Sequence, residues 1–246
     1  MRGVSNVRFG HPRHHLATVD STNRLARELA EHAPPGTIVT AAAQTAGRGR
    51  HGRRWVTPSG RAVAYSAVLK PFDSPSPLLS IAVGVAVCEA TEKLGGRGVE
   101  LKWPNDVWVA GRKLAGILIE SRAPDWAVIG IGLNLDVDKG DLPDDGGHGA
   151  ASLGRDTRFE DAVEQLNLAL TRWVYAPDVE VLAAFRRYDL LYGSRIVWSV
   201  PGVDDGIPEG NTGEAKGIDD KGRLIVEKAD GETVTLDSGE VSLRPY

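Results

Sequence analysis

The segment spanning residues 78–94 constrains the fold more than any other part of the chain. Its first three turns, LLSIAVGVAVC, are apolar on almost every face of a helix. A helix with apolar residues all round its surface is normally buried, because a surface helix keeps a polar stripe toward water. The sequence therefore predicts a buried helix, which needs other elements packed around it.

Strand and helix patterns alternate along the first three quarters of the chain. Turn signals such as Pro104-Asn105-Asp106 and Ala110-Gly111-Arg112 separate several of the strand candidates. The mixture predicts an α/β (α+β) domain with a mixed sheet at its centre. The expected strands are residues 37–43, 62–70, 99–103, 107–109, 114–120 and 127–135. The other expected helices are residues 20–32, capped by Asp20 or Ser21, and residues 160–175 and 179–192.

The pattern changes near residue 192. From Gly193 onward the chain shows short β-runs bounded by glycine or aspartate turns, at residues 195–200, 212–218, 224–228 and 233–236. These runs predict a separate small β-barrel over residues 192–246, which follows a larger domain over residues 1–191. Residues 139–149, rich in glycine and aspartate, are expected to form a mobile surface loop.

The charge distribution argues against a general nucleic-acid binder. The formal net charge of the chain is -4, whereas such proteins usually carry a basic excess. Residues 193–246 contain six basic and eleven acidic side chains, which leaves 23 basic and 22 acidic ones in the rest of the chain. Any cluster of basic residues is therefore a local feature.

Cysteine content and hydropathy exclude further classes. The single cysteine, Cys88, rules out an internal disulfide and a cysteine-rich metal site, and its apolar surroundings predict a buried structural thiol. The first ten residues lack the apolar core of a secretory signal. The longest strongly apolar run, residues 78–88, is too short to cross a bilayer. A cytoplasmic protein without a membrane partner is expected.

The segment QTAGRGRHGRRW, residues 44–55, contains three glycines and four arginines and no acidic residue. Glycine permits close backbone approaches, and arginine presents a planar, permanently charged fork that suits carboxylates and phosphates. This combination indicates a loop that binds a small anionic ligand. A solvated basic loop or an RNA-binding segment accounts for the same residues equally well.

Three further islands of polar residues and glycines lie near predicted strand ends. KWPND, residues 102–106, offers Asn105 and Asp106 to a ligand, although an ordinary turn explains it too. In RKLAGILIE, residues 112–120, Gly116 interrupts a strand, which indicates a close approach to its backbone. IGIGLN, residues 129–134, has two strand glycines and an asparagine, which are also compatible with a bulged core strand.

Taken together, the motifs GRGRHGRRW, KWPNDV, RKLAGILIE and IGLNL, in this order after STN, resemble the biotin–protein ligases. The resemblance runs from about residue 19 to residue 135 and continues more weakly into the C-terminal β-module. It implies an α/β catalytic domain followed by a small SH3-like barrel. Because few residues precede STN, it is the short form, without an N-terminal DNA-binding domain, that the chain resembles, and no repressor activity or DNA partner is expected.

The resemblance also implies a reaction and its partners. Biotin and ATP, with Mg²⁺, would form biotinyl-5′-adenylate, and the acyl group would pass to one lysine of a biotin carboxyl carrier domain. Bringing the biotin carboxylate to the α-phosphate joins two anions, and fixed cations favour that approach. The arginines and Lys113 suit this role. A monomer or weak homodimer is expected.

Individual roles follow from the resemblance position by position. The implied catalytic residues are Lys113, Arg48 and Arg50. The implied biotin-binding residues are Ser21, Thr22, Gln44, Gly47, Arg48, Lys113, Gly116 and Gly130. The implied ATP or adenylate residues are Arg50, Arg53, Trp55, Asn105, Asp106 and Asn134, with Asp106 also a candidate magnesium ligand.

Several of these residues also have purely structural explanations. Trp55 has a core position as its alternative, because large aromatic side chains are usually mostly buried. Ser21 and Thr22 have helix capping as theirs, a role compatible with ligand contact. Because like charges repel within an empty glycine-rich loop, residues 47–54 are expected to be mobile without ligand and ordered over the adenylate.

Two rival functions remain open from the sequence. A lipoate–protein ligase or octanoyltransferase shares the fold superfamily and also acylates a carrier lysine, although GRGRHGRRW and KWPND argue against it. An RNA-binding protein that uses the arginine loop would need a basic surface beyond that loop. The balanced body and acidic tail do not supply one.

Overall fold

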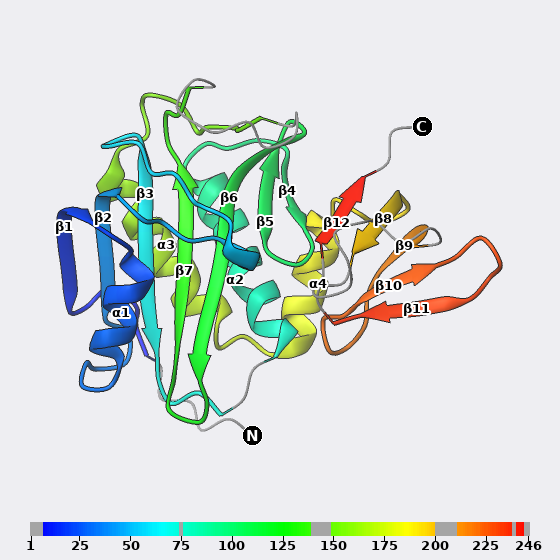
Figure 1. Cartoon of the computed structure of the whole chain (residues 1–246), viewed down its shortest axis with the longest axis horizontal. Coiled ribbons are helices and arrows are strands. Elements are labelled where there is room, and N and C mark those ends of the chain that lie inside the picture. The colour runs from blue at the N-terminus through cyan, green and yellow to red at the C-terminus, as the bar shows by residue number, and fades with distance from the viewer. Residues whose placement is uncertain (1–6, 74–75, 139–148, 200–210, 238–239, 244–246) are drawn as a thin grey trace.

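A seven-stranded mixed sheet forms the centre of the larger part of the molecule (Figure 1). The computed structural model describes residues 7–73, 76–138, 149–199, 211–237 and 240–243. The strand order is β1-β2-β3-β7-β6-β5-β4, with β1 parallel to β2 and the other pairs antiparallel. The strands are β1 (Arg13–Val19), β2 (Ile38–Gln44), β3 (Ala62–Leu69), β4 (Val99–Lys102), β5 (Asp106–Val109), β6 (Arg112–Arg122) and β7 (Trp126–Asn134).

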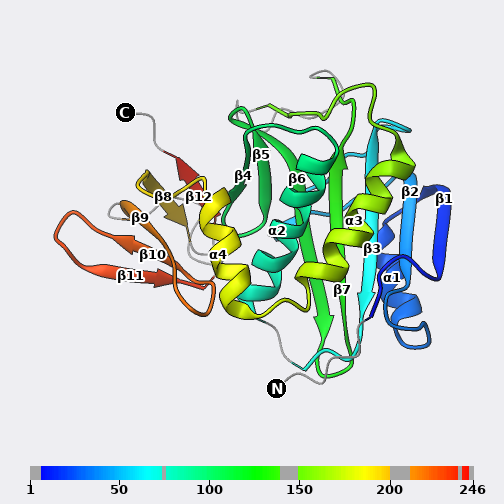
Figure 2. The same cartoon turned by 180° about the vertical axis from the view of Figure 1, so that it is seen from behind.

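The predicted buried helix, α2 (Pro77–Lys93), lies against one face of this sheet beside α3 (Phe159–Trp173), as Figure 2 shows. The Ser76 Oγ accepts a hydrogen bond from the Leu78 amide at 3.2 Å and caps the first turn of α2. Burial of Ile81, Val83, Val85 and Val87 is complete. The all-round apolar pattern is explained, because α2 packs between the sheet, α3 and α4 (Asp178–Tyr188).

The opposite face of the sheet carries α1 (Thr22–Ala30), seen in front of the strands in Figure 1. Alternation along β2 separates the two sides: Ile38 joins the main core with α2, whereas Val39 packs with Ala26 and Ala30 of α1. This second face stays open beyond α1, so loops that follow the strands can lie over it.

A second, antiparallel sheet of five strands follows, in the order β11-β10-β9-β8-β12. In the part of the chain that is described, β11 and β12 are the two edges, so the sheet is open and the predicted small β domain is not a closed barrel. The boundary between residues 191 and 192 stays a prediction. The strands are β8 (Arg195–Ser199), β9 (Thr212–Ile218), β10 (Leu224–Glu227), β11 (Thr233–Leu236) and β12 (Glu240–Leu243).

The structure departs from the sequence prediction at the elements that lack a regular apolar pattern. β1 and β12 were not predicted; β1, RHHLATV, is a half-exposed edge strand. Helix α4 ends at Tyr188 instead of residue 192, because the Leu190 amide bonds to the Leu101 carbonyl of β4 at 3.2 Å. Of the predicted loop at residues 139–149, all but Gly149 lies outside the described residues.

No helix within the described ranges combines the length and the apolarity that a bilayer span requires.

The buried Cys88 provides a test of the packing around α2. Burial raises the pKa of its thiol, so the reactive thiolate is disfavoured as well as inaccessible. Labelling with an aromatic disulfide reagent is expected only when the protein unfolds, with a rate that follows global unfolding in denaturant. Stoichiometric labelling of native protein at the rate of a free thiol would contradict this packing.

Candidate functional site

Three glycines leave part of the open face of the sheet without side chains. Gly130 and Gly132 are two residues apart on β7 and therefore share a face, and Gly116 of β6 is the cross-strand partner of Gly132. A Cβ atom at Gly132 would lie 2.1 Å from the Trp55 indole, and one at Gly116 would lie 3.1 Å from it. Only glycine lets the indole lie this close to the sheet.

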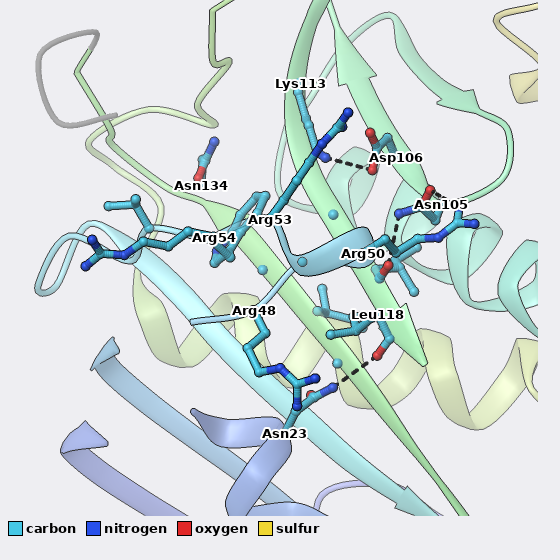
Figure 3. Close-up of a pocket in the computed structure, with 18 of the residues that line it drawn as sticks. Asn23, Arg48, Arg50, Arg53, Arg54, Asn105, Asp106, Lys113, Leu118 and Asn134 are labelled. Carbon is cyan, nitrogen blue, oxygen red and sulfur yellow. Dashed lines mark hydrogen bonds and ion pairs between the residues drawn. The ribbon is translucent and has the colours of Figure 1, made fainter. Parts of the chain in front are cut away.

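Gly130 makes the same kind of room for a different side chain. A Cβ atom there would lie 2.1 Å from the Asn23 Oδ1. The Asn23 amide nitrogen donates to the Leu118 carbonyl at 3.2 Å (Figure 3). It also donates to the Glu120 Oε2 at 3.0 Å. The space above Gly130 is therefore occupied by Asn23, which the sequence prediction did not include among the site residues.

A buried polar chain continues from Asn23. The Ser66 Oγ lies 2.6 Å from the Asn23 Oδ1 and 2.8 Å from the Thr22 Oγ1. The Thr22 backbone amide donates to the Gln44 Oε1 at 2.8 Å, and the Gln44 Nε2 donates to Thr57. These contacts fix each side chain by at least one bond, so this end of the site has a defined pattern of donors and acceptors.

Ser21 directly precedes α1 and caps its first turn. Its Oγ accepts from the Arg24 amide at 3.4 Å, and Ser21 also lines the cavity described below. The cap role expected from the sequence is confirmed, and it coexists with the exposure of this residue to the cavity.

The arginine loop folds over the open face and includes a short 3-10 turn, η1 (Arg50–Gly52). Side-chain contacts tie it down. The Arg50 Nη1 donates to the Asn105 Oδ1 at 2.9 Å (Figure 3). The Arg48 Nη1 lies 3.1 Å from the Glu120 Oε1. The loop returns on itself through the bond from the Gly49 amide to the Arg53 carbonyl, 2.7 Å. Arg48 and Arg50 of the loop are therefore held by two different residues of the main domain, Glu120 and Asn105.

Lys113 and Asp106 form an ion pair at the other end of the site. The Lys113 Nζ lies 2.8 Å from the Asp106 Oδ1 and 5.7 Å from the centre of the Trp55 ring. The pair comes from adjacent strands, since β5 and β6 are hydrogen-bonded neighbours. The Lys113 ammonium group is thus held near the Trp55 ring by its pairing with Asp106.

Near this pair, the buried Trp55 Nε1 and Asn134 Oδ1 have no hydrogen-bond partner among the described residues. Asn134 is 2% exposed, and its Nδ2 donates to the Ala151 carbonyl at 3.1 Å, which fixes the direction of the amide. An unpaired buried polar atom costs about 1–3 kcal/mol. The unpaired donor and acceptor are therefore suited to a ligand that brings complementary groups.

Most of these groups border one cavity of about 350 Å³. The sequence-predicted residues that line it are Ser21, Thr22, Gln44, Arg48, Arg50, Arg53, Trp55, Asn105, Asp106, Lys113, Gly116, Gly130 and Asn134. Gly47 does not line it. A Cβ atom at Gly47 would lie 2.3 Å from the Trp55 carbonyl, so this glycine permits the close return of the loop.

The structure adds residues that the sequence prediction missed. Asn23, Leu118, Gly132 and Val241 also line the cavity. Asn23 is the third residue of the STN motif, and Gly132 follows Gly130 at strand period, so both carried a signal. Leu118 lies in a plain apolar run, and Val241 belongs to the second sheet.

Comparison with known proteins identifies the family. Residues 16–136 match the model of the biotin/lipoate A/B protein ligase family, and residues 207–244 match that of the biotin protein ligase C-terminal domain. The chain is 34% identical over 241 residues to the biotin–[acetyl-CoA-carboxylase] ligase of Mycobacterium tuberculosis, covering 92% of this chain and 86% of that protein. The chain belongs to the biotin–protein ligase family.

Two solved structures of biotin protein ligases share this fold. The Aquifex aeolicus enzyme in complex with biotin and ATP is 27% identical, with a TM-score of 0.80 over 96% of this chain and all of that one. The Leishmania major enzyme in complex with biotinyl-5-AMP is 26% identical, with a TM-score of 0.65 over 93% of this chain and all of that one. The fold class and family expected from the sequence motifs are confirmed.

The contact between Gly130 and Asn23 yields a stability prediction. Gly130→Ala is expected to lower the free energy of unfolding by about 1–3 kcal/mol, because the methyl group overlaps the fixed Asn23 amide. Gly49→Ala is the control: Gly49 has an ordinary φ of -112°, and its added Cβ would come no closer than 3.5 Å to another atom. Denaturant unfolding of both variants measures the difference. Equal free energies of unfolding would refute the overlap.

Proposed function

We propose that this protein activates biotin with ATP to biotinyl-5′-adenylate and transfers the biotinyl group to a lysine of a biotin carboxyl carrier domain. The membership of the ligase family and the named activity of the Mycobacterium tuberculosis relative support this function. The bound molecules of the Aquifex and Leishmania enzymes support both the substrates and the intermediate.

The observation that carries the proposal is a single cavity with two chemically distinct ends and cations at both. Arg48 belongs to the end with Thr22, Asn23 and Gln44, to which it is joined through Glu120. Lys113 belongs to the end with Trp55 and Asp106. This arrangement suits a ligand with a polar ring system at one end, an aromatic base at the other and anionic groups along its length.

At the first end, we assign Ser21, Thr22 and Gln44 to the ureido ring of biotin. A ureido group has both N–H donors and a carbonyl acceptor, and the hydroxyl and amide groups of these residues supply both kinds of partner. Asn23 joins this set, because its side chain lines the cavity and is locked above Gly130. Gly116 and Gly130 also border the cavity, and their lack of side chains leaves room for Asn23, Trp55 and a ligand together.

At the second end, we assign Trp55 and Asn134 to the adenine of ATP. The buried Asn134 Oδ1 lacks a donor, and the adenine amino group is one. The Trp55 indole lies close to the backbone at Gly116 and Gly132 and offers an aromatic surface. Arg53 and Asn105 line the same cavity and are assigned to the phosphates and ribose.

In the first step, a biotin carboxylate oxygen attacks the α-phosphorus, the bond to the bridging oxygen breaks, and pyrophosphate leaves. Two anions must approach each other, and Lys113, Arg48 and Arg50 supply positive charge at fixed positions that favours this approach. In the second step, the carrier lysine amine attacks the acyl carbon, AMP leaves, and the amine loses a proton. Closure of the arginine loop would keep water from the acyl-adenylate.

Magnesium enters this proposal as a companion of ATP. Within the described residues, no group of three or more histidine, cysteine, aspartate or glutamate side chains is placed to hold a metal ion. One carboxylate together with phosphate oxygens is, however, a common magnesium environment. Asp106, which lines the cavity and pairs with Lys113, fits that single-carboxylate role.

The acceptor proposed is the biotin carrier domain of an acetyl-CoA carboxylase, after the activity named for the Mycobacterium tuberculosis relative. The oligomeric state, a monomer or weak homodimer, stays a prediction.

The function is tested by incubating the protein with biotin, labelled ATP and a biotin carboxyl carrier domain. Pyrophosphate release and one biotinylated lysine on the carrier are expected. Parallel reactions with lipoate or octanoate in place of biotin separate the rival acylations. Carrier modification with lipoate but none with biotin would overturn the proposal.

Lys113→Ala is expected to slow pyrophosphate formation by about 100-fold or more, since a fixed charge near the reacting phosphate is lost. Biotin affinity measured by calorimetry without ATP should change by less than about threefold. Lys216→Ala is the control, because Lys216 pairs with Glu214 and Glu227 on the second sheet and does not line the cavity. Normal turnover in Lys113→Ala would refute the assigned role.

The arginine loop is expected to be more mobile without ligand, because its four arginines carry like charges that repel one another within a glycine-rich segment. Limited trypsin digestion should cut residues 47–54 in the free protein and slow when biotin and ATP are both present. Cleavage that remains equally fast with both substrates would contradict closure of the loop.

A further inference from the structure

A buried hydrogen bond joins the KWPND segment to the second sheet. Trp103 is 1% exposed, and its indole Nε1 donates to the Gly222 carbonyl at 3.0 Å. Gly222 lies in the turn between β9 and β10, whereas Trp103 directly follows β4 of the main sheet. The two parts of the molecule therefore share a specific polar contact that is shielded from water.

The turn that offers this carbonyl is held in place by its own hydrogen bonds. The Asp219 Oδ1 accepts from the Lys221 and Arg223 amides, each at 2.9 Å, and the Asp219 Oδ2 pairs with the Arg223 guanidinium at 2.7 Å. The Gly222 amide donates to the Asp219 carbonyl at 3.1 Å. The position of the Gly222 carbonyl is thus fixed by the turn itself.

The same turn also packs on the start of α2. A Cβ atom on Gly222 would lie 3.1 Å from the Leu78 amide nitrogen and 3.3 Å from the Leu78 side chain. From α2, the Ser80 Oγ donates to the Pro104 carbonyl at 2.9 Å. Three segments therefore meet at one junction: the turn around Gly222, the start of α2, and Trp103-Pro104. The turn contacts both of the others, and α2 is hydrogen-bonded to Pro104.

The residues that follow this junction lie in the candidate site. The Asn105 Oδ1 receives the bond from Arg50, and its Nδ2 donates to the Ile117 carbonyl at 3.0 Å. The next residue, Asp106, pairs with Lys113. The second sheet also reaches the cavity directly, because Val241 of β12 is part of its lining. A shift of Trp103 would therefore be passed on to both cation contacts.

We propose that the turn around Gly222 is a positioning element for the nucleotide end of the site, and that Trp103 is the positioning residue through which it acts. This inference rests on the proposed function and extends it to the second sheet. Trp103 borders the cavity, but the turn itself does not. It sets where Asn105 and Asp106 stand, and hence how Arg50 and Lys113 meet the phosphates, without touching the biotin end.

Two pairs of matched variants test this role. Trp103→Phe removes the indole donor and Trp126→Phe is its control, because Trp126 is also buried, at 8% exposure, and its Nε1 has no partner in the described residues. Gly222→Ala crowds Leu78, and Gly231→Ala is its control. The two glycines have φ of +81° and +86°, but no atom lies within 4 Å of a Cβ at Gly231. The backbone strain of an alanine is therefore matched within the second pair.

The measurement is pyrophosphate release as a function of ATP and of biotin, with the thermal midpoint recorded for each variant. Trp103→Phe and Gly222→Ala are expected to raise KM for ATP by about fivefold or more and to leave KM for biotin within about twofold. Both controls should leave both constants within about twofold. A merely structural role would lower stability or the amount of active protein without separating the two constants.

Each outcome decides a different point. Unchanged KM for ATP in Trp103→Phe and Gly222→Ala, or equal changes for ATP and biotin, would overturn the positioning role while the proposed function stands. The same holds if Gly231→Ala raises KM for ATP as much as Gly222→Ala. Failure of the unaltered protein to release pyrophosphate from biotin and ATP would refute the proposed function and the positioning role with it.

Discussion

The site depends on a patch of sheet that has no side chains. Gly116 of β6 and Gly132 of β7 are cross-strand partners, and Gly130 precedes Gly132 by two residues on β7. Because no Cβ atoms project there, the Trp55 indole and the Asn23 amide lie directly on the backbone. Strands this poor in side chains pair less strongly, and the burial of β3 and β7 within the sheet compensates for that loss. Aliphatic residues at these three positions would overlap the Trp55 indole and the Asn23 amide.

Three cations that line the cavity have polar partners without a ligand. Glu120 pairs with Arg48, Asp106 pairs with Lys113, and the Asn105 oxygen receives Arg50. A buried or half-buried cation without such a partner would be costly, so these contacts let the empty site keep its cations in place. Under the proposed function, an anionic substrate exchanges one set of partners for another. The fixed charges then need little reorganisation during the reaction.

The helices and strands that could be predicted from the sequence are those with strong local patterns. The apolar α2 and the strands β2, β3, β6 and β7 were predictable because period and turn residues agree with the final fold. β1 was not, because its exposed edge position gives no apolar alternation. The motif residues were found, but what their glycines accommodate was not: the partner of Gly130 is Asn23, far away in sequence, and Gly47 shapes the loop instead of lining the cavity. The contact of Trp103 with Gly222 joins two domains and has no local signal.

The central claim is that one cavity joins biotin to a nucleotide. Native mass spectrometry of the protein after incubation with biotin, ATP and magnesium, without a carrier, tests it most directly. The account predicts a complex whose added mass equals one biotinyl-5′-adenylate, and the loss of that mass when a carrier domain is added. A protein that retains biotin and ATP separately, and never their condensation product, would contradict it.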